Sequence, residues 1–570
     1  MKNKNSTFRI RLIYSFLLCI GAVLFVKLYL VQIVNGSEYS ERADRQYVRL
    51  NQDFFERGSI FFEAKDGSKL SVASLKTGFM LVINPRLIKS ATTTYKLISE
   101  ILPIDEELFL SKAGKQNDQY EEIAKQLDEE VALKIKERKI PGVTLVKQKW
   151  RFYSSRGLAS QILGFVGYKG TTQAGRYGLE SFYDDVLGRN PEALNVNFFA
   201  EIFSDLNKTV RKGEDIEGDL VATIEPTVEA YVEDTLEKIN KKWQADLSGA
   251  IVIDPKTGKI YAMAGYPSFD PNSFGKEKDP SVFSNSLVER VYEMGSIVKP
   301  LTMAAGIDAG VVTATTTYQD KGFLVIDGKR ISNFDGKGRG VVSMQEVLNQ
   351  SLNTGAAFVE NLLGNQRFTK YMYSFGLGEK TGIDLPNEAA NLVENLNSSR
   401  DIEHATASYG QGIATTPIAT VRALSALGNG GFLIQPRVVS KINYRLGFSK
   451  DVTIEVGRQV IKKETSKAIT DMLVTAVDKG LVGGTYSIPN YSVAAKTGTA
   501  QIANHATQKY YSDRFLHSFF GYFPAYDPKF LVFLFMVNPH GAQFASETLP
   551  APFFGIAKFL IHYYEIPPDR

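Results

Sequence analysis

Cysteine and histidine are scarce in this sequence, which has one of the former and five of the latter among 570 residues. The single cysteine, Cys19, lies in an apolar N-terminal run, so the chain after it can form no intrachain disulfide and must be stabilised by packing. The histidines and the cysteine form no cluster with the spacing of metal ligands. We therefore expect no metal ion and no other cofactor.

An excess of one charge sign is also missing. The formal net charge is +4, which is too small over this length to indicate a nucleic-acid partner. Hydrophobic residues make up 44% of the chain and charged residues 22%, a composition typical of folded proteins. The length of 570 residues exceeds that of one ordinary domain, so we expect several units.

The N-terminus carries a long hydrophobic run. Leu12 to Val34 can cross a hydrocarbon core of about 30 Å as a helix, interrupted only by Lys27 and Gln32. Basic residues without acidic ones precede it, which places residues 1–11 in the cytoplasm and the chain after Val34 outside. A cleaved signal peptide is the alternative. Because the run is long for one and no small-x-small site follows, we favour a retained anchor over 12–34 and a linker over 35–50.

Residues 51–215 combine short strands with helix signals. Ser59–Phe62 and Phe79–Ile83 are typical of strands, and turn residues separate them. Over Tyr120–Lys139 apolar residues recur every fourth position between charged ones, which predicts an amphipathic helix ended by Pro141. No cluster here requires catalysis, so we interpret the region as a spacer or pedestal.

Residues 216–570 predict a mixed α/β unit with helices on both faces of a sheet. Phe530–Val537 is apolar at every position, as in a central strand covered on both faces. A long, mostly helical insert separates the two ends of this unit. The elements expected around it are a helix over Pro226–Trp243, a hairpin of Gly249–Asp254 with Lys259–Gly265, strands over Ser518–Phe523 and Phe530–Val537, and a helix over Pro552–Tyr564.

A Ser-x-x-Lys pattern at Ser296 and Lys299 is the candidate reactive site. Gly295 followed by an apolar run predicts a helix that begins at Ser296, and Lys299 then lies one turn along on the same face. A desolvated lysine amine can take the proton of a serine hydroxyl, and the positive end of the helix favours an oxyanion. The pattern alone is weak, because it recurs at Ser273 in a loop.

Two further motifs strengthen this site. Ser351-Leu352-Asn353 and Lys496-Thr497-Gly498-Thr499 follow Ser296 in that order. Lys-Thr-Gly occurs four times, yet only the copy at Lys496 lies in a strand-like run, Tyr491–Ile502, where a glycine would let a substrate backbone approach the edge.

Together these motifs resemble the penicillin-binding transpeptidases and serine β-lactamases. The resemblance implies that Ser296 is acylated, that Lys299 is its general base and that Ser351 relays a proton to the leaving amine. Asn353 would hold the substrate amide. The motif Lys496, Thr497, Gly498 and Thr499 would bind the substrate, with Lys496, Thr497 and Thr499 receiving the carboxylate of a D-Ala-D-Ala stem. The backbone N–H groups of Ser296 and Thr499 would form the oxyanion hole.

Further segments narrow the resemblance to class B penicillin-binding proteins, most like the division-specific FtsI family. They are Arg57-Gly58-Ser59-Ile60, Gly157-Leu158-Ala159-Ser160, Gly178-Leu179-Glu180, Ala222-Thr223-Ile224-Glu225, Pro267-Ser268-Phe269-Asp270-Pro271-Asn272 and Gly410-Gln411-Gly412 with Thr416-Pro417. The family implies a dimerisation-type pedestal over 51–215 and a transpeptidase domain over 216–570, with the penicillin-binding fold of a central antiparallel sheet flanked by helices.

The same resemblance implies the biology. The chain would be a single-pass protein of the bacterial cell membrane that cross-links peptidoglycan stem peptides, a D-Ala-D-Ala donor and a diamino-acid acceptor, and that β-lactams acylate. A membrane glycosyltransferase is the implied partner. Elongation-specific relatives share the plan, so division and elongation both stay open. Three residues depart from the family pattern, Met294, Ala495 and Glu225, and none of them removes a reacting group.

Three rival functions share some of these features. A β-lactamase would use the same acylating groups and would also hydrolyse the acyl-enzyme, but it needs neither an anchor nor a pedestal. A β-lactam sensor or division scaffold would require that the three motifs be vestigial. A Ser-His-Asp hydrolase is disfavoured because none of the five histidines lies in a motif.

Overall fold

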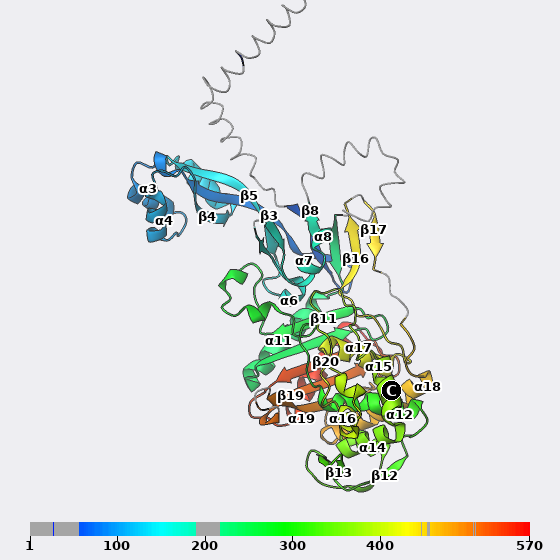
Figure 1. Cartoon of the computed structure of the whole chain (residues 1–570). Coiled ribbons are helices and arrows are strands. Elements are labelled where there is room, and N and C mark those ends of the chain that lie inside the picture. Colours follow the sequence, from blue (N-terminus) through cyan, green and yellow to red (C-terminus); the bar gives the residue numbers. More distant parts are fainter. Residues whose placement is uncertain are drawn as a thin grey trace, which may run out of the picture. The chain divides into compact units, whose positions relative to one another are not determined.

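The computed structural model describes Lys27, residues 56–189 and residues 217–570, apart from residues 171, 446, 453–456, 505, 506 and 508. The described chain forms two compact units, one of residues 77–150 and one of residues 56–76 with 151–570 (Figure 1). No helix in these described ranges is long and apolar enough to cross a membrane. The expected anchor over 12–34 lies, except for Lys27, outside them, as does the expected boundary at 215/216, and both stay predictions.

The smaller unit packs three helices against three strands. The second half of β3 pairs with β4 and with β5, and Ile98, Phe109 and Ile135 are buried in the core. Its elements are β3 (Lys69–Ile83), η2 (Pro85–Leu87), α3 (Ala91–Ser99), α4 (Glu106–Ala113), β4 (Glu121–Leu127), α5 (Glu129–Glu137) and β5 (Val143–Tyr153).

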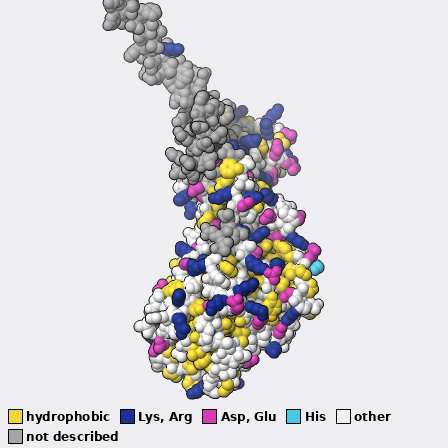
Figure 2. All heavy atoms as spheres, turned by 90° about the vertical axis from the view of Figure 1, so that its right-hand side faces the viewer, with side chains coloured by type: hydrophobic (Ala, Val, Ile, Leu, Met, Phe, Trp, Pro, Cys, Tyr) yellow, Lys and Arg dark blue, Asp and Glu magenta, His cyan; other side chains and the backbone are white. Residues whose placement is uncertain are grey.

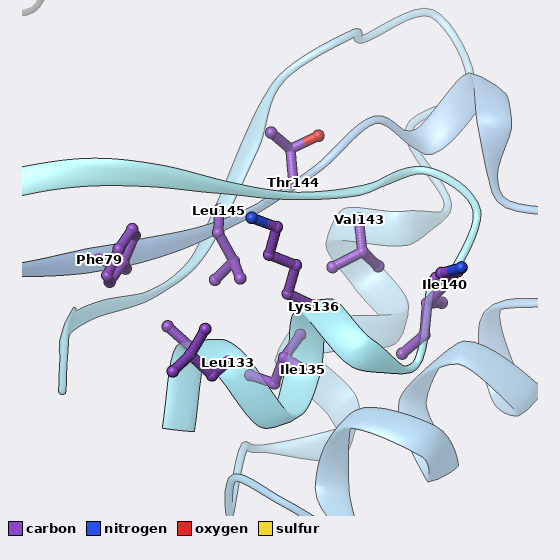
Figure 3. A pocket seen from close by; sticks show the side chains of 10 residues that line it. Phe79, Leu133, Ile135, Lys136, Ile140, Val143, Thr144 and Leu145 are labelled. Atoms are coloured by element: carbon purple, nitrogen blue, oxygen red, sulfur yellow. The ribbon is translucent and has the colours of Figure 1, made fainter. Parts of the chain in front are cut away.

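A cavity of about 340 Å³ lies in this unit, beside α5. Phe79, Leu133 and Leu145 line it together with other apolar side chains, and Lys136 extends along its wall (Figure 3). The cavity thus continues the apolar core of the unit toward the surface of α5.

The predicted helix over Tyr120–Lys139 is wrong in its first half. Residues Glu121–Leu127 form β4, and only Glu129–Glu137 are helical, ending before Pro141. Apolar residues four positions apart lie on one face of a strand, which has a period of two, and also on one face of a helix. The spacing of Ile123 and Leu127 therefore could not distinguish a strand from a helix. The pairing of β4 with β3 decides for the strand.

The larger unit begins with a sheet in the order β17-β16-β9-β2-β3. Strand β2 pairs in parallel with β9 and antiparallel with β3, so residues near 60, 220 and 440 lie side by side. The expected strand over Ser59–Phe62 is confirmed as β2. The elements of this part are β1 (Glu56–Arg57), β2 (Ile60–Glu63), α6 (Ser160–Leu163), β6 (Val166–Lys169), β7 (Thr172–Gly175), α7 (Gly178–Phe182), α8 (Asp184–Leu187), β8 (Gly188–Arg189), β9 (Gly218–Ala222), β16 (Val439–Tyr444) and β17 (Ser449–Asp451).

An antiparallel five-stranded sheet in the order β11-β10-β20-β19-β18 organises the rest of the larger unit. The predicted hairpin, the two late strands and the first and last helices are confirmed. Strand β20 is central and buried, and β18 is an edge strand. These elements are α11 (Pro226–Trp243), β10 (Leu247–Ile253), β11 (Ile260–Tyr266), β18 (Ala494–Asn504), β19 (Lys509–Phe523), β20 (Phe530–Val537), α19 (Ala545–Thr548) and α20 (Pro550–Tyr563).

Helices cover both faces of this sheet. Val532 and Leu534 of β20 pack in one core with α11 and α20, whereas Phe533 and Phe535 face a second core with α12, α17 and α18. The mostly helical insert is confirmed, and it also carries two small antiparallel sheets, one of β12 with β15 and one of β13 with β14.

The elements of the insert run from η3 to η8: η3 (Phe274–Lys276), η4 (Pro280–Phe283), η5 (Gly295–Val298), α12 (Lys299–Asp308), β12 (Thr317–Asp320), β13 (Phe323–Ile326), β14 (Lys329–Ser332), β15 (Gly340–Ser343), α13 (Met344–Asn349), α14 (Asn353–Leu363), α15 (Asn365–Ser374), η6 (Glu394–Asn397), α16 (Asp401–Ala407), α17 (Pro417–Gly428), α18 (Lys463–Thr475), η7 (Ala476–Gly480) and η8 (Leu481–Gly484). On the face shown in Figure 2, side chains of both charge signs are interspersed with hydrophobic ones.

Candidate active site

Ser296 lies in the short 3-10 turn η5, which leads directly into α12. The predicted helix start is therefore present as a tighter turn. Ser296 is half-buried, and within the described residues its hydroxyl makes no hydrogen bond. A hydroxyl held in a fixed turn, and not engaged by the protein, is available to a substrate.

Backbone contacts hold this turn against the edge of the sheet. The Gly295 N–H donates to the Gly410 carbonyl at 3.1 Å, and the Ser518 hydroxyl donates to the Met294 carbonyl at 2.8 Å. Gly295 has a φ of +63°, and a Cβ there would lie 2.7 Å from the Thr499 oxygen. Only glycine fits this position without strain.

Lys299 is buried, with 1% of its surface exposed, at the first turn of α12. Its Nζ donates to the Ser351 carbonyl at 2.5 Å and to the Ser351 Oγ at 3.2 Å. Burial, and next the positive charge of Lys496, hold the pKa of Lys299 well below its usual value. The direct reach from Lys299 to Ser296 that the sequence predicted is not among the hydrogen bonds of the described residues, because the amine turns to Ser351.

Ser351 occupies the turn between α13 and α14, in the left-handed backbone region with a φ of +56°. This conformation is unfavourable for serine by about 1–2 kcal/mol and has to be held by its surroundings. The Ser351 Oγ accepts hydrogen bonds from both Lys299 and Lys496, at 3.2 and 3.0 Å. Its own proton is thus free to point toward a third group.

Asn353 opens α14 two residues after Ser351. Its Nδ2 donates to the Ser332 carbonyl of β14 at 2.9 Å, which fixes the orientation of the amide. Behind it, Thr354 bonds to Asp320 and to Asn333, so the small antiparallel sheets are tied to the start of α14. The sequence gave no sign of these supporting residues.

Lys496 is almost fully buried on the edge strand β18. Burial lowers its pKa to about 8. The Nζ contacts the Ser351 Oγ and the Thr497 carbonyl at 3.0 and 3.1 Å. Thr497 and Thr499 are half-buried, and the Thr499 Oγ1 accepts a hydrogen bond from the Ala545 N–H at 3.0 Å.

Gly498 lies in this strand as predicted. A Cβ there would lie 2.2 Å from the Ser518 Oγ and 2.7 Å from the Met294 carbonyl. The missing side chain therefore makes room for the turn that carries Ser296, and the predicted approach of a substrate backbone to this glycine stays a prediction.

Glu293 and Tyr510 were missed by the sequence analysis. The Glu293 carboxylate accepts hydrogen bonds from the Gly412 N–H and the Tyr510 hydroxyl, each at 3.0 Å. Burial raises the pKa of Glu293. The position of Glu293 just before the Ser-x-x-Lys turn was a usable signal, whereas Tyr510 had none.

Three separate chain segments meet at the Ser351 hydroxyl. Lys299 and Lys496 both donate to it, and Ser296 lies in the turn that leads into the helix of Lys299. No group of three or more His, Cys, Asp or Glu side chains in the described ranges could hold a metal ion. His517, the histidine on β19, bonds to Thr548 and to the Gln543 carbonyl and not to a reacting serine.

Comparison with known proteins agrees with this geometry. The family described as penicillin-binding protein dimerisation domain matches residues 56–217, and the penicillin binding protein transpeptidase domain matches residues 248–556. Stage V sporulation protein D of Bacillus subtilis (strain 168) is 31% identical over 97% of this chain and 86% of its own. The peptidoglycan D,D-transpeptidase FtsI of Buchnera aphidicola subsp. Schizaphis graminum (strain Sg) is 26% identical, over 96% of this chain and 94% of its own.

A solved structure supports the fold. Penicillin binding protein 2X of Streptococcus thermophilus superimposes with a TM-score of 0.73 at 18% identity, covering 89% of this chain and 79% of its own. The two matched domains follow one another in the order that the sequence resemblance implied. The chain belongs to the class B penicillin-binding proteins.

Proposed function

We propose that this chain is a peptidoglycan D,D-transpeptidase that works through an acyl-enzyme on Ser296. The observation that carries the proposal is the Ser351 hydroxyl, which accepts hydrogen bonds from the amines of Lys299 and Lys496, while Ser296 lies in the turn directly before the helix of Lys299. This arrangement supplies a nucleophile, a neutral base, a proton relay and a cation for a carboxylate. The chain's membership of the family and its similarity to a relative named as a peptidoglycan D,D-transpeptidase, FtsI, support it.

In the first half-reaction the Ser296 Oγ attacks the carbonyl carbon between the two terminal D-Ala residues. Its proton passes to the amine of Lys299, and the lowered pKa of Lys299 favours the neutral form that can accept it. The backbone N–H groups of Ser296 and Thr499 hold the oxyanion, each donor contributing about 3 kcal/mol. The C–N bond then breaks, and Ser351 delivers the proton to the departing D-Ala amine.

In the second half-reaction an acceptor amine takes the place of D-Ala. It attacks the Ser296 ester, loses a proton through Ser351 to Lys299, and releases the serine hydroxyl with a new amide bond formed. Asn353 holds the amide of the donor peptide in both half-reactions. Lys496, Thr497 and Thr499 receive the terminal carboxylate of the donor in the first half-reaction, and this carboxylate leaves with D-Ala before the acceptor binds. A β-lactam carries an equivalent carboxylate and acyl group, so it acylates the same serine.

The test is covalent labelling of the full-length chain in detergent by a fluorescent penicillin, followed by intact-mass measurement and peptide mapping. Wild type should gain one drug mass on Ser296, and Ser296→Ala should abolish labelling. Ser273→Ala is the matched control, because Ser273 heads the second Ser-x-x-Lys pattern and should label like wild type.

Other outcomes separate the rival functions. An adduct on another serine would refute the assignment of Ser296. Consumption of drug without an adduct would identify a β-lactamase. A stable adduct without cross-linking of stem peptides in the presence of an acceptor would identify a sensor.

The cellular setting belongs to the proposal as well. An anchor over 12–34 would hold the protein in the bacterial cell membrane with the pedestal over 51–215 and the catalytic domain over 216–570 outside, beside a membrane glycosyltransferase. We favour a septal role because the FtsI of Buchnera aphidicola matches along nearly the whole chain. Depletion should then give filamentous cells, whereas rounded cells would indicate elongation.

A further inference from the structure

A second cavity lies in the larger unit, and its lining does not include Ser296. It has a volume of about 1120 Å³ and is bordered by β12, β13, α14 and α15. Figure 1 labels these four elements. Leu324 and Ile326 of β13 form one apolar wall, and Ala357, Phe358 and Leu363 form another. A cavity of this size can accept a small organic ligand.

A buried carboxyl group lines this cavity. Glu360 of α14 is 3% exposed, and its Oε1 has no hydrogen-bond partner among the described residues. A buried polar atom without a partner costs about 1–3 kcal/mol, and more when it is charged. Because Glu360 lines the cavity, a ligand there would lie beside a carboxyl group that lacks one hydrogen-bond partner.

The neighbouring charges leave Glu360 without a cation. Arg367 of α15 donates to the Leu363 carbonyl at 2.8 Å, and Asp401 of α16 accepts from Asn365 at 2.8 Å. Asp327, in the turn after β13, accepts from the Ile402 N–H at 3.0 Å. The lining thus has three carboxyl groups and one guanidinium, which is already engaged.

We propose that this cavity binds a molecule with a short apolar stem that ends in a primary ammonium group, and that Glu360 receives the ammonium. The stem would lie between β13 and Phe358, where it removes apolar surface from water. The ammonium would supply the missing partner of the carboxylate in a charge-assisted hydrogen bond. A free diamine and the side-chain amine of a peptidoglycan stem peptide both have this chemistry.

Binding of this kind depends on pH. Burial, and next the charge of Asp401, raise the pKa of Glu360 to about 7. Arg367 and the Tyr318 hydroxyl of β12 are the other titratable groups that line this side of the cavity with Asp327. An alkylammonium stays charged throughout, so affinity follows the ionised fraction of Glu360. That fraction rises about tenfold from pH 6 to pH 8.

The probe is n-pentylammonium, titrated into the full-length protein in detergent and followed by ligand-observed NMR. We expect binding to strengthen about tenfold between pH 6 and pH 8, and pentanol and pentanoate to bind at least tenfold more weakly at pH 8. Glu360→Gln should lose the pH dependence and most of the affinity. Glu394→Gln, which removes an exposed acid of the same unit, should match wild type.

Stability and the active site give independent controls. Glu360→Leu removes a buried polar group, so it should melt no lower than wild type and still fail to bind pentylammonium. Ser296→Ala should bind pentylammonium normally, which separates this site from the proposed transpeptidase reaction. Unchanged binding by Glu360→Gln, or equal binding of pentanol, would overturn the proposal.

Two further titrations distinguish the sources of the amine. Displacement of pentylammonium by a stem tetrapeptide with a free diamino-acid amine, but not by its N-acetylated form, would assign the site to the stem peptide. Displacement by cadaverine alone would assign it to a free diamine. Displacement by the acetylated peptide would contradict recognition of the ammonium.

Discussion

Ser351 is the residue on which the chemistry of the site converges. Its hydroxyl accepts hydrogen bonds from two buried lysines, and its backbone has the left-handed conformation that aims it between them. Two amines in one buried site repel each other when both are protonated. Burial, and next the charge of Lys496, lower the pKa of Lys299, so part of this shift depends on the charge of Lys496.

This dependence predicts the effect of Lys496→Met. Removal of the Lys496 charge should raise the pKa of Lys299, so the rise of penicillin acylation with pH should move to higher pH. The rate at pH 7 should also fall about ten- to a hundredfold, because a charge-assisted bond to the substrate carboxylate is lost. Stopped-flow acylation between pH 5 and pH 10 measures both effects.

The matched control for this measurement is Lys463→Met, which removes an exposed charge at the start of α18. It should leave the pH profile in place. If Lys496→Met lowers the acylation rate at every pH but leaves the pH at which the rate rises unchanged, Lys496 binds the substrate and does not affect the pKa of Lys299.

At the scale of elements, the contact between η5 and β18 positions Ser296. Gly498→Ala would place a Cβ against the Ser518 Oγ and the Met294 carbonyl, so the turn must move away from the strand. We expect penicillin labelling to fall at least tenfold while the far-UV CD spectrum stays native, because a small displacement of a nucleophile is costly for the rate.

Gly275→Ala, at a glycine of η3 with open space around it, is the control for this substitution and should label like wild type. Normal labelling of Gly498→Ala would show that the turn can adapt. Ser518→Gly combined with Gly498→Ala should recover part of the activity, since it removes the nearest clashing atom.

His517 links β19 to the segment around α19. It is fully buried, and because a carbonyl only accepts, its Nε2–H donates to the Gln543 oxygen at 3.1 Å. Its Nδ1 lies 2.9 Å from the Thr548 hydroxyl. This segment also supplies the Ala545 N–H that bonds to Thr499, the residue opposite His517 in the sheet.

Acid should therefore destabilise this link. Burial lowers the pKa of His517 from 6.5 to about 4. Between pH 4 and pH 6.5 the unfolded chain is therefore protonated at His517 while the folded chain is not, and protonation favours unfolding. The contribution of neutral His517 to the free energy of unfolding should be fully present above pH 6.5. The free energy of unfolding should then fall by on the order of 3 kcal/mol as the pH drops to 4. Urea unfolding of wild type and His517→Gln across this range should show a flatter dependence for the variant. An equal slope in both proteins would exclude His517 as the cause.

The sequence predicted elements where local pattern and tertiary pairing agree. The hairpin of β10 and β11 and the all-apolar strand β20 are examples, since their turn residues and burial are visible in the chain itself. The sequence-based prediction was wrong at Glu121–Leu127, because the four-residue spacing of apolar side chains there fits both a helix and the strand that forms. The three motifs could be placed in order, but the turning of Lys299 toward Ser351 and the isolation of Glu360 depend on packing between distant segments.

At the scale of the molecule, a buried ionic network joins the start of the dimerisation domain to its later segments. Arg57 donates to the carboxylates of Glu180 and Asp184 at 2.5 and 2.7 Å. Arg151 donates to Glu180 at 2.6 Å and to the Gly58 carbonyl at 2.7 Å. Burial alone would raise the pKa of Glu180. The charges of the two guanidinium groups have the larger combined effect, however, and they hold the pKa of Glu180 below its usual value.

Removal of this central charge should destabilise the larger unit. Glu180→Gln would leave two buried guanidinium groups with one carboxylate between them, at a cost of about 3–5 kcal/mol. Glu237→Gln breaks an exposed pair with Lys241 on α11 and should leave the melting temperature unchanged. Differential scanning calorimetry with and without penicillin tests this. Because the network lies outside the motifs, Glu180→Gln should still be acylated at low temperature, and loss of acylation in the folded variant would contradict a purely structural role.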